Sequence, residues 1–142
     1  MIQEYSAGFI LFKENPAQER EYLILHYPGG HFDFPKGHLE NEEDTLAAAN
    51  RELQEETGIS DIDRIPDFEV RIDYEFRHKG ELINKSVTFY LAKTSQEQVV
   101  ISREHQNFVW LSYEKAIQKV TFKNAREVLE KAEQKLKSFN KN

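Results

Sequence analysis

The residues best suited to chemistry are three glutamates within one predicted helical turn, Glu52, Glu55 and Glu56. Their i, i+3 and i+4 spacing covers roughly 100° of arc, so they share one face of the helix. Crowded carboxylates repel one another and raise their own pKa values. A divalent cation removes this conflict, and oxygen-rich sites suit Mg²⁺ or Mn²⁺. A solvated acidic face would also explain an isolated E-x-x-E-E helix, so the flanking residues must decide.

Those flanking residues favour a metal site. A glycine-containing loop precedes the helix, Arg51 adjoins Glu52, and Gly58 stands where a helix commonly ends in a left-handed residue. The helix is predicted over residues 44–57 by an i, i+3, i+4, i+7 stripe with one polar member. The stripe consists of Leu46, Ala49, Asn50 and Leu53. The helix and the loop before it must therefore position the glutamates.

Strands are predicted where aromatic and β-branched residues cluster. The predicted strands are 5–13, 21–27, 68–77, 85–93 and a short one at 107–111. A polar hairpin around Lys79 and Gly80 should join the third and fourth, and residues 31–40 should form a structured loop before the acidic helix. Strands and helices thus interleave, which predicts an α/β domain with a mixed sheet covered by helices.

Two further helices follow. Ser112 is predicted to cap a short helix over 113–119. Asn124, with Glu127 three residues later, gives a capping-box-like start to the last helix. Its apolar stripe is Ala125, Val128, Leu129, Ala132 and Leu136. Residues 139–142 are expected to fray.

Composition narrows the function classes. The 142 residues fit a single domain, 1–142, and the absence of cysteine excludes disulfides and cysteine nucleophiles. No apolar run approaches the length of a membrane span, about 18 residues. The formal charge of −6 makes the surface a poor platform for nucleic acid. We therefore expect a cytoplasmic monomer without a membrane partner or a stable nucleic-acid partner. A polyanionic ligand would need metal ions and a few well-placed cations.

Residues 37–59, GHLENEEDTLAAANRELQEETGI, resemble the signature of the Nudix family, G-x5-E-x7-R-E-U-x-E-E-x-G-U, where U is bulky and aliphatic. Every fixed position is matched. These positions are Gly37, Glu43, Arg51, Glu52, Leu53, Glu55, Glu56, Gly58 and Ile59. The resemblance implies the Nudix fold, an α/β/α sandwich with a mixed β-sheet and a loop–helix segment. It also implies hydrolysis of a nucleoside diphosphate linked to another group.

The resemblance further implies roles for the signature residues. Glu52, Glu55 and Glu56 would hold Mg²⁺, or Mn²⁺, with the backbone carbonyl of Gly37 as a further ligand. Arg51 would orient a glutamate through charge-assisted hydrogen bonds. Catalytic roles therefore fall to Glu52, Glu55 and Arg51.

Two roles lie next to this cluster. Glu43 would support the loop and the helix rather than bind metal. The general base that takes the proton of the attacking water would come from the signature helix or from Glu104, which precedes the aromatic strand at 107–111. The sequence leaves this choice open.

The flanking segments are similar to those of asymmetric diadenosine tetraphosphate hydrolases. The similar segments are F-P-K-G-H at 34–38, SAGFILF at 6–12, KSVTFYLAK at 85–93, EHQNFVWL at 104–111 and TFKNA at 121–125. A tetraphosphate bridge carries about four negative charges, and lysine can contact phosphate as a compact point charge. The candidate phosphate-binding residues are His31, Lys36, His38 and Lys85.

Tyr74 and Phe122 align with aromatic positions that sandwich a base in these hydrolases. Such stacking contributes roughly 1–3 kcal/mol per base. The resemblance therefore implies a small-molecule dinucleoside polyphosphate as the partner, with diadenosine tetraphosphate giving ATP and AMP. Metal-activated water would attack phosphorus in this reaction.

Two kinds of alternative remain. The same chemistry could act on RNA 5′-triphosphate ends, on dinucleoside polyphosphates of other lengths or on inositol pyrophosphates, although the two aromatic residues favour a nucleobase over an inositol ring. A non-catalytic nucleotide-binding Nudix module is an alternative of a different class. Such modules usually lose carboxylates of the signature, whereas this chain keeps all of them.

Overall fold

The computed structural model describes residues 1–96, 98–102 and 107–139. The described residues form a seven-stranded mixed sheet, of which the main path runs β3-β2-β1-β6-β5. Its strands are β1 Ile2–Glu14, β2 Arg20–His26, β3 Phe32–Asp33, β4 Lys36–His38, β5 Ile62–His78, β6 Glu81–Thr94 and β7 Asn107–Leu111. β1 and β6 run parallel, and the other pairs are antiparallel.

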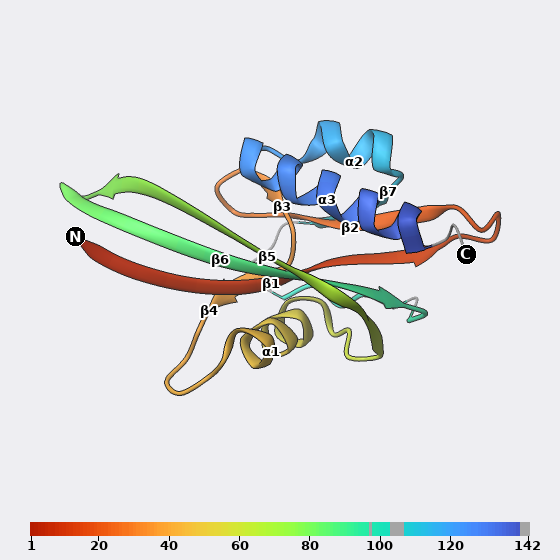
Figure 1. The fold of residues 1–142 in the computed structure, drawn as a ribbon, viewed down its shortest axis with the longest axis horizontal. Helices are drawn as coiled ribbons and strands as arrows, with labels where there is room; N and C mark the ends of the chain where they lie inside the picture. Colours follow the sequence, from red (N-terminus) through yellow and green to blue (C-terminus); the bar gives the residue numbers. More distant parts are fainter. Residues whose placement is uncertain (97, 103–106, 140–142) are drawn as a thin grey trace.

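The helices lie on both sides of this sheet. Helix α1, Thr45–Thr57, packs under one face, while α2, Tyr113–Lys119, and α3, Lys123–Phe139, cover the other (Figure 1). Alternate side chains of the strands point to opposite faces, so each face has its own core. Phe9 and Leu11 pack with α1, whereas Ile10 and Phe12 pack toward α2 and α3. The predicted α/β/α sandwich with a mixed sheet is therefore confirmed.

The acidic helix forms where the sequence predicts it. Asp44 is its N-cap, and its side chain accepts a hydrogen bond from the Ala47 N–H. Gly58 ends the helix in the left-handed conformation, at a φ of 72°, and its N–H donates to the Gln54 carbonyl. Ala49 and Leu53 of the predicted stripe are buried, but Asn50 is exposed. One stripe residue therefore faces solvent instead of the sheet.

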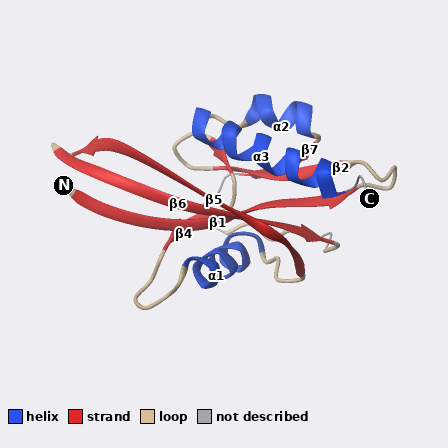
Figure 2. Cartoon of the chain, viewed as in Figure 1, coloured by secondary structure: helices blue, strands red, loops and turns tan. Residues whose placement is uncertain are grey.

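The remaining elements form near their predicted positions, although several strands are longer than predicted. The structured loop at 31–40 contains the short strands β3 and β4, and Lys79 and Gly80 form the β5–β6 turn with positive φ angles (Figure 2). Strands β1, β5 and β6 begin earlier than predicted, at Ile2, Ile62 and Glu81. The register of β5 is irregular between Arg64 and Glu69. The five-residue apolar stripe of α3 is buried as predicted.

The predicted capping box of α3 is wrong. The helix begins at Lys123, so Asn124 lies in its first turn, and the Arg126 N–H donates to the Phe122 carbonyl. Ser112 does precede α2, but its side chain makes no capping hydrogen bond. Helix α3 includes Phe139, the first residue of the stretch expected to fray, and residues 140–142 lie outside the described part of the chain.

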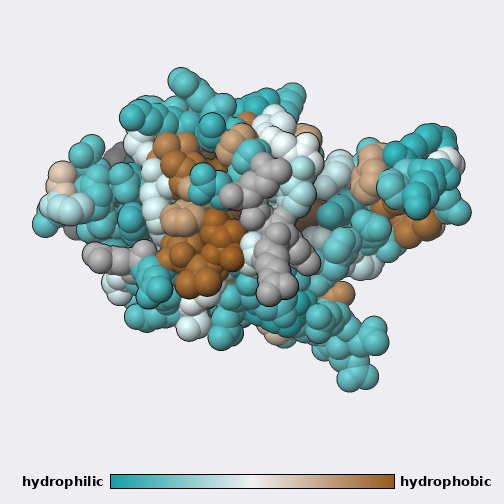
Figure 3. Space-filling view, turned by 180° about the vertical axis from the view of Figure 1, so that it is seen from behind, coloured by the Kyte–Doolittle hydropathy of each residue, from teal (hydrophilic) through white to brown (hydrophobic). Residues whose placement is uncertain are grey.

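The surface matches the acidic, polar composition. The face turned away from the viewer in Figure 1 is largely hydrophilic, with a hydrophobic area on the body of the molecule (Figure 3). Within the described residues, no helix is long and apolar enough to cross a bilayer.

Candidate active site

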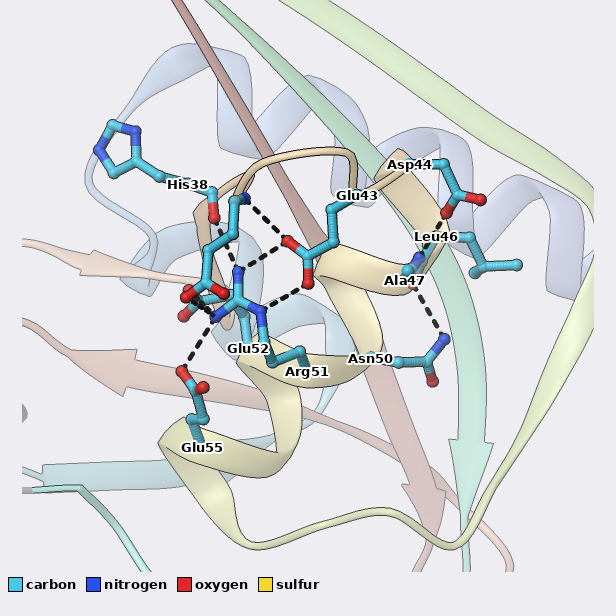
Figure 4. A network of polar contacts seen from close by, with 10 residues as sticks. His38, Glu43, Asp44, Leu46, Ala47, Asn50, Arg51, Glu52 and Glu55 are labelled. Atoms are coloured by element: carbon cyan, nitrogen blue, oxygen red, sulfur yellow. Dashed lines mark hydrogen bonds and ion pairs between the residues drawn. The ribbon is translucent and has the colours of Figure 1, made fainter.

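Arg51 connects most of the acidic residues of the loop–helix segment (Figure 4). Its Nε donates to Glu43 over 2.6 Å, and its Nη1 donates to both Glu52 and Glu55, over 3.0 and 3.1 Å. Its Nη2 donates to the His38 carbonyl over 2.9 Å. These carboxylates raise the pKa of the guanidinium, with Glu43 the largest cause, so Arg51 is a permanent cation. One side chain thus orients two of the three glutamates that are predicted to bind metal.

Glu43 fixes the shape of the loop before the helix. Both of its carboxylate oxygens accept hydrogen bonds from Arg51, and one also accepts from the Glu40 N–H over 2.9 Å. Arg51 and the Glu40 amide lower the pKa of the Glu43 carboxyl below its usual value. The carboxylate of Glu43 is therefore engaged with the loop and with Arg51.

Gly37 brings the backbone of β4 against Glu52. A β-carbon built on Gly37 would lie 2.1 Å from Glu52 Cδ, well inside van der Waals contact. Only a glycine at this position leaves room for the carboxylate. The backbone of Gly37 and the side chain of Glu52 are therefore direct neighbours, as a shared oxygen-donor site requires.

Glu56 faces the interior, unlike Glu55. Its side chain is buried, whereas the Glu55 side chain is 57% exposed. Burial raises the pKa of the Tyr27 phenol well above its usual value, and the nearby charges of Glu56, Asp33 and Glu52 add to this effect. Glu52 and Glu56 therefore both lie close enough to Tyr27 for their charges to raise the pKa of its phenol.

Among the described residues, no three acidic or histidine side chains are grouped closely enough to hold a metal ion as they stand. This is understandable because Arg51 Nη1 lies between Glu52 and Glu55. Glu104, the predicted alternative base, lies outside the described residues. The Ser102 N–H donates to the Glu56 carbonyl over 3.1 Å, which places this end of the described chain beside the acidic helix.

A cavity of about 490 Å³ opens between β5, β6, the loop before β4 and the start of α3. Five of the six substrate-binding residues expected from the sequence line it. They are His31, Lys36, Tyr74, Lys85 and Phe122. Four segments that are distant in sequence therefore line one cavity: residues 31–36, β5, β6 and residues 122–125.

The cavity is cationic on one side. Lys36 belongs to β4, and Lys85 belongs to β6, which pairs with β5 at Tyr74. Burial lowers the pKa of Lys85, and the neighbouring charge of Lys36 lowers it further. Burial also lowers the pKa of His31. Two like charges held together in a half-buried hollow favour an anionic ligand.

Aromatic side chains also line the cavity. Tyr74 is half-buried, and Phe122, just before α3, is 50% exposed. The rings of His31 and Phe122 lie 5.3 Å apart at an angle of 50°. An exposed aromatic ring at the rim of a cavity is available to stack on a planar ligand.

The side chain of His38 is not among those that line the cavity. Its carbonyl accepts from Arg51 instead, and burial together with the charge of Lys85 lowers the pKa of its imidazole. Sequence reasoning also missed several lining residues. These are Asp33, Ile72, Phe76, Val87, Phe89, Asn124 and Ala125. The alternation Ile72, Tyr74, Phe76 was a usable signal, because alternate residues of a strand share a face.

Three consecutive residues join the cavity to the acidic cluster. Lys36 lines the cavity, Gly37 contacts the Glu52 carboxylate, and the His38 carbonyl accepts from Arg51. Strand β4 is held in place by pairing with β1, where Gly8 is opposite Lys36. The anion-binding cavity and the carboxylates are therefore parts of one site.

A second cavity of about 540 Å³ is bordered by β2, β7 and α2. Its lining residues include His26, Phe32, Lys115 and Lys119. The rings of His26 and Phe32 stack at 4.2 Å, and Lys119 Nζ lies 4.1 Å from the centre of the Phe32 ring. None of the site residues expected from the sequence lines this cavity.

A loop–helix segment in which one arginine contacts four acidic residues, set on an α/β/α sandwich, defines a class of domain that the comparisons identify. The family model described as NUDIX domain matches residues 5–132. The chain belongs to the Nudix family, and it is a hydrolase.

The proteins that this chain resembles align with it over most of its length. The asymmetrical bis(5′-nucleosyl)-tetraphosphatases of Mus musculus and Sus scrofa are 35% and 37% identical. The aligned regions cover 91% and 94% of this chain, and 92% and 96% of those proteins. The crystal structure of a C. elegans Ap4A hydrolase binary complex is similar with a TM-score of 0.86 and 32% identity. That match covers 96% of this chain and 99% of the C. elegans chain.

Proposed function

We propose that the chain is a Mg²⁺-dependent pyrophosphohydrolase that cleaves dinucleoside polyphosphates, with diadenosine tetraphosphate giving ATP and AMP. The observation that carries this proposal is the continuity of β4, in which Lys36 faces the cavity while Gly37 contacts the Glu52 carboxylate. A polyphosphate bound by the lysines would therefore lie next to the carboxylates. The names of the related tetraphosphatases support this choice of substrate.

The residues at the acidic cluster fit Mg²⁺. Carboxylate and carbonyl oxygens are the donors that this cation prefers, and Glu52, Glu55, Glu56 and the Gly37 carbonyl would supply them. The close approach of Gly37 to Glu52 places the carboxylate of α1 directly against the backbone of β4, which supports this choice of donors. Mn²⁺ would suit the same donors. When bound, the metal would neutralise phosphate oxygens and lower the pKa of an attacking water.

The protein's own residues would bind and orient the substrate. Lys36 and Lys85 would contact the phosphates and stabilise charge on the leaving portion. Tyr74 and Phe122 would hold one adenine by stacking. His31 stacks on Tyr27 at 5.0 Å, which holds its imidazole at the cavity wall. Together these contacts would place a bridging phosphate beside Glu52.

In the reaction a water oxygen would form a bond to phosphorus, and one bridging P–O bond would break. Glu52, oriented by Arg51, and Glu104 are the two candidates for accepting the proton of that water. Comparing pH profiles of kcat for Glu52→Gln and Glu104→Gln would identify the general base. Only the variant that lacks the base should lose the fall in kcat at acidic pH.

The decisive experiment incubates the full chain with Mg²⁺ and diadenosine tetraphosphate in ¹⁸O-labelled water. The products are then separated by chromatography, and their masses are determined by mass spectrometry. We expect equal amounts of ATP and AMP, with the label in one of them, which identifies the attacked phosphorus. Glu56→Gln should abolish the reaction, and Glu21→Gln, a change on β2 outside both the cavity and the acidic cluster, should leave it within about twofold.

Other outcomes would contradict the proposal. Faster release of pyrophosphate from triphosphorylated RNA would overturn the choice of substrate. Nucleotide binding without hydrolysis, unchanged by Glu56→Gln, would instead indicate a non-catalytic binding module.

A further inference from the structure

Asp33 is a buried carboxylate inside a cavity that otherwise suits anions. It lies at the end of β3, its side chain is 7% exposed, and it lines the cavity together with Lys36, Lys85 and His31. A carboxylate at this position would repel a polyphosphate, and its burial has a desolvation cost unless it is paired. Its presence in the cavity therefore needs an explanation.

The two oxygens of Asp33 have different partners. Oδ1 accepts from the Phe34 N–H over 2.7 Å, which fixes the orientation of the carboxylate. Oδ2 lies 3.7 Å from Lys36 Nζ. Because the first oxygen is held by the backbone, the second is aimed at the ammonium group.

Lys36 has a second contact that restricts its position. Its Nζ lies 6.0 Å from the centre of the Tyr27 ring, and the Tyr27 hydroxyl donates to the Phe34 carbonyl over 2.8 Å. Asp33 and Tyr27 are therefore both tied to Phe34, one to its N–H and the other to its carbonyl. A free lysine side chain has many rotamers, and these contacts reduce their number before any ligand binds.

We infer that Asp33 is a positioning residue that holds Lys36 toward the bound polyphosphate. The inference rests on the proposed function, since it takes the phosphate chain as the ligand of Lys36. Asp33 contributes a negative charge that Lys36 compensates, so the pair is favourable only while both members are present. Pairs that act through one another give non-additive effects in a double-mutant cycle.

The test is a double-mutant cycle between Asp33→Asn and Lys36→Met. Asparagine keeps an oxygen that can accept from the Phe34 N–H, so the local backbone contact survives. Asp63→Asn is the matched control, because Asp63 is exposed on β5, does not line the cavity and undergoes the same change of charge. Equilibrium binding of ATP with Mg²⁺ is measured by calorimetry, and circular dichroism establishes that each variant is folded.

We expect Asp33→Asn to weaken ATP binding about 5- to 10-fold in the otherwise native chain. In the Lys36→Met background the same change should strengthen binding, because it removes a carboxylate that has lost its cation. A residue needed only for folding would weaken binding in both backgrounds. Asp63→Asn should change affinity less than about twofold. With diadenosine tetraphosphate as substrate, Asp33→Asn should raise KM by a similar factor.

Three results would overturn the inference. The first is the same loss of affinity in both backgrounds, which would show that Asp33 acts independently of Lys36. The second is tighter ATP binding by Asp33→Asn in the native background, which would show that Asp33 weakens ATP binding. The third is a change in the Mg²⁺ concentration for half-maximal activity without a change in ATP affinity, which would make Asp33 a metal ligand.

Failure of the proposed function would be seen separately. In that case the native chain would release no ATP and AMP from diadenosine tetraphosphate, whatever the outcome of the binding cycle. Conversely, hydrolysis with a purely additive cycle would overturn the role of Asp33 alone.

Discussion

Gly37 and Glu52 are in direct contact, because a β-carbon on Gly37 would lie 2.1 Å from the Glu52 Cδ atom and 2.3 Å from its Oε2. The two residues are 15 positions apart in sequence and come from different elements, β4 and α1. Their contact fixes the distance between the strand that carries Lys36 and the carboxylate cluster. The rate of catalysis should therefore depend on this contact between Gly37 and Glu52.

Gly37→Ala should therefore damage catalysis more than stability. The added methyl group would displace the Glu52 carboxylate, and a misplacement of about 1 Å costs on the order of 100-fold in rate. Steady-state kinetics should show this loss in kcat, with a smaller change in the urea midpoint. As a control, Gly30→Ala lies in a turn where an added β-carbon meets nothing within 4 Å, although its φ of 93° adds strain. A Gly37→Ala variant with native kcat would disprove the required close approach.

Arg51→Lys should weaken the loop–helix network although the charge is kept. A lysine cannot replace a guanidinium that contacts Glu43 through two nitrogens and the His38 carbonyl as well. We expect kcat to fall about 10- to 100-fold, in line with other residues that orient metal ligands. The measurement is kcat at saturating Mg²⁺ together with the Mg²⁺ concentration for half-maximal activity. Equal activity of Arg51→Lys and the native chain would show that charge alone suffices.

Tyr74 and Phe122 should contribute to nucleobase binding. Phe122→Ala removes a half-exposed ring, so its effect on folding should be small. If each ring stacks on adenine, each alanine variant should lose about 1–3 kcal/mol of binding, which is roughly 5- to 150-fold in KM. Tyr74→Phe should retain native KM because the stacking face is kept. Tyr5→Ala removes a ring of similar exposure outside the cavity and is the matched control. Unchanged KM in both alanine variants would place the base elsewhere.

Asp73 should make stability depend on pH in the acidic range. The Ser86 hydroxyl and Arg71 both donate to its carboxylate, and these contacts lower its pKa in the folded protein. A lowered folded pKa means that the stabilisation is complete above the unfolded value, about 3.9, and is lost as pH falls through the folded value. Urea unfolding of the native chain and Asp73→Asn should therefore differ at pH 6 and converge near pH 2. A constant difference across this range would show that the carboxylate's charge is not responsible.

The sequence by itself determined the elements and the acidic cluster. Strand patterns, the Asp44 start and the Gly58 stop of α1 follow from local rules that a few neighbouring residues obey. The spacing of Glu52, Glu55 and Glu56 was equally local, because residues three and four apart on a helix are neighbours. The spacing alone did not predict that Glu56 is buried while Glu55 is exposed.

Only the tertiary structure decided which distant residues share a cavity. Asp33 looked like an ordinary loop residue until the fold buried it beside Lys36, and Asn124 was predicted as a cap although it lines the cavity. The position of Lys85 opposite Tyr74 depends on the register between β5 and β6. Register and burial arise from pairing and packing across the whole sheet, and a one-residue shift would turn each side chain to the other face. No local stretch of sequence contains that information.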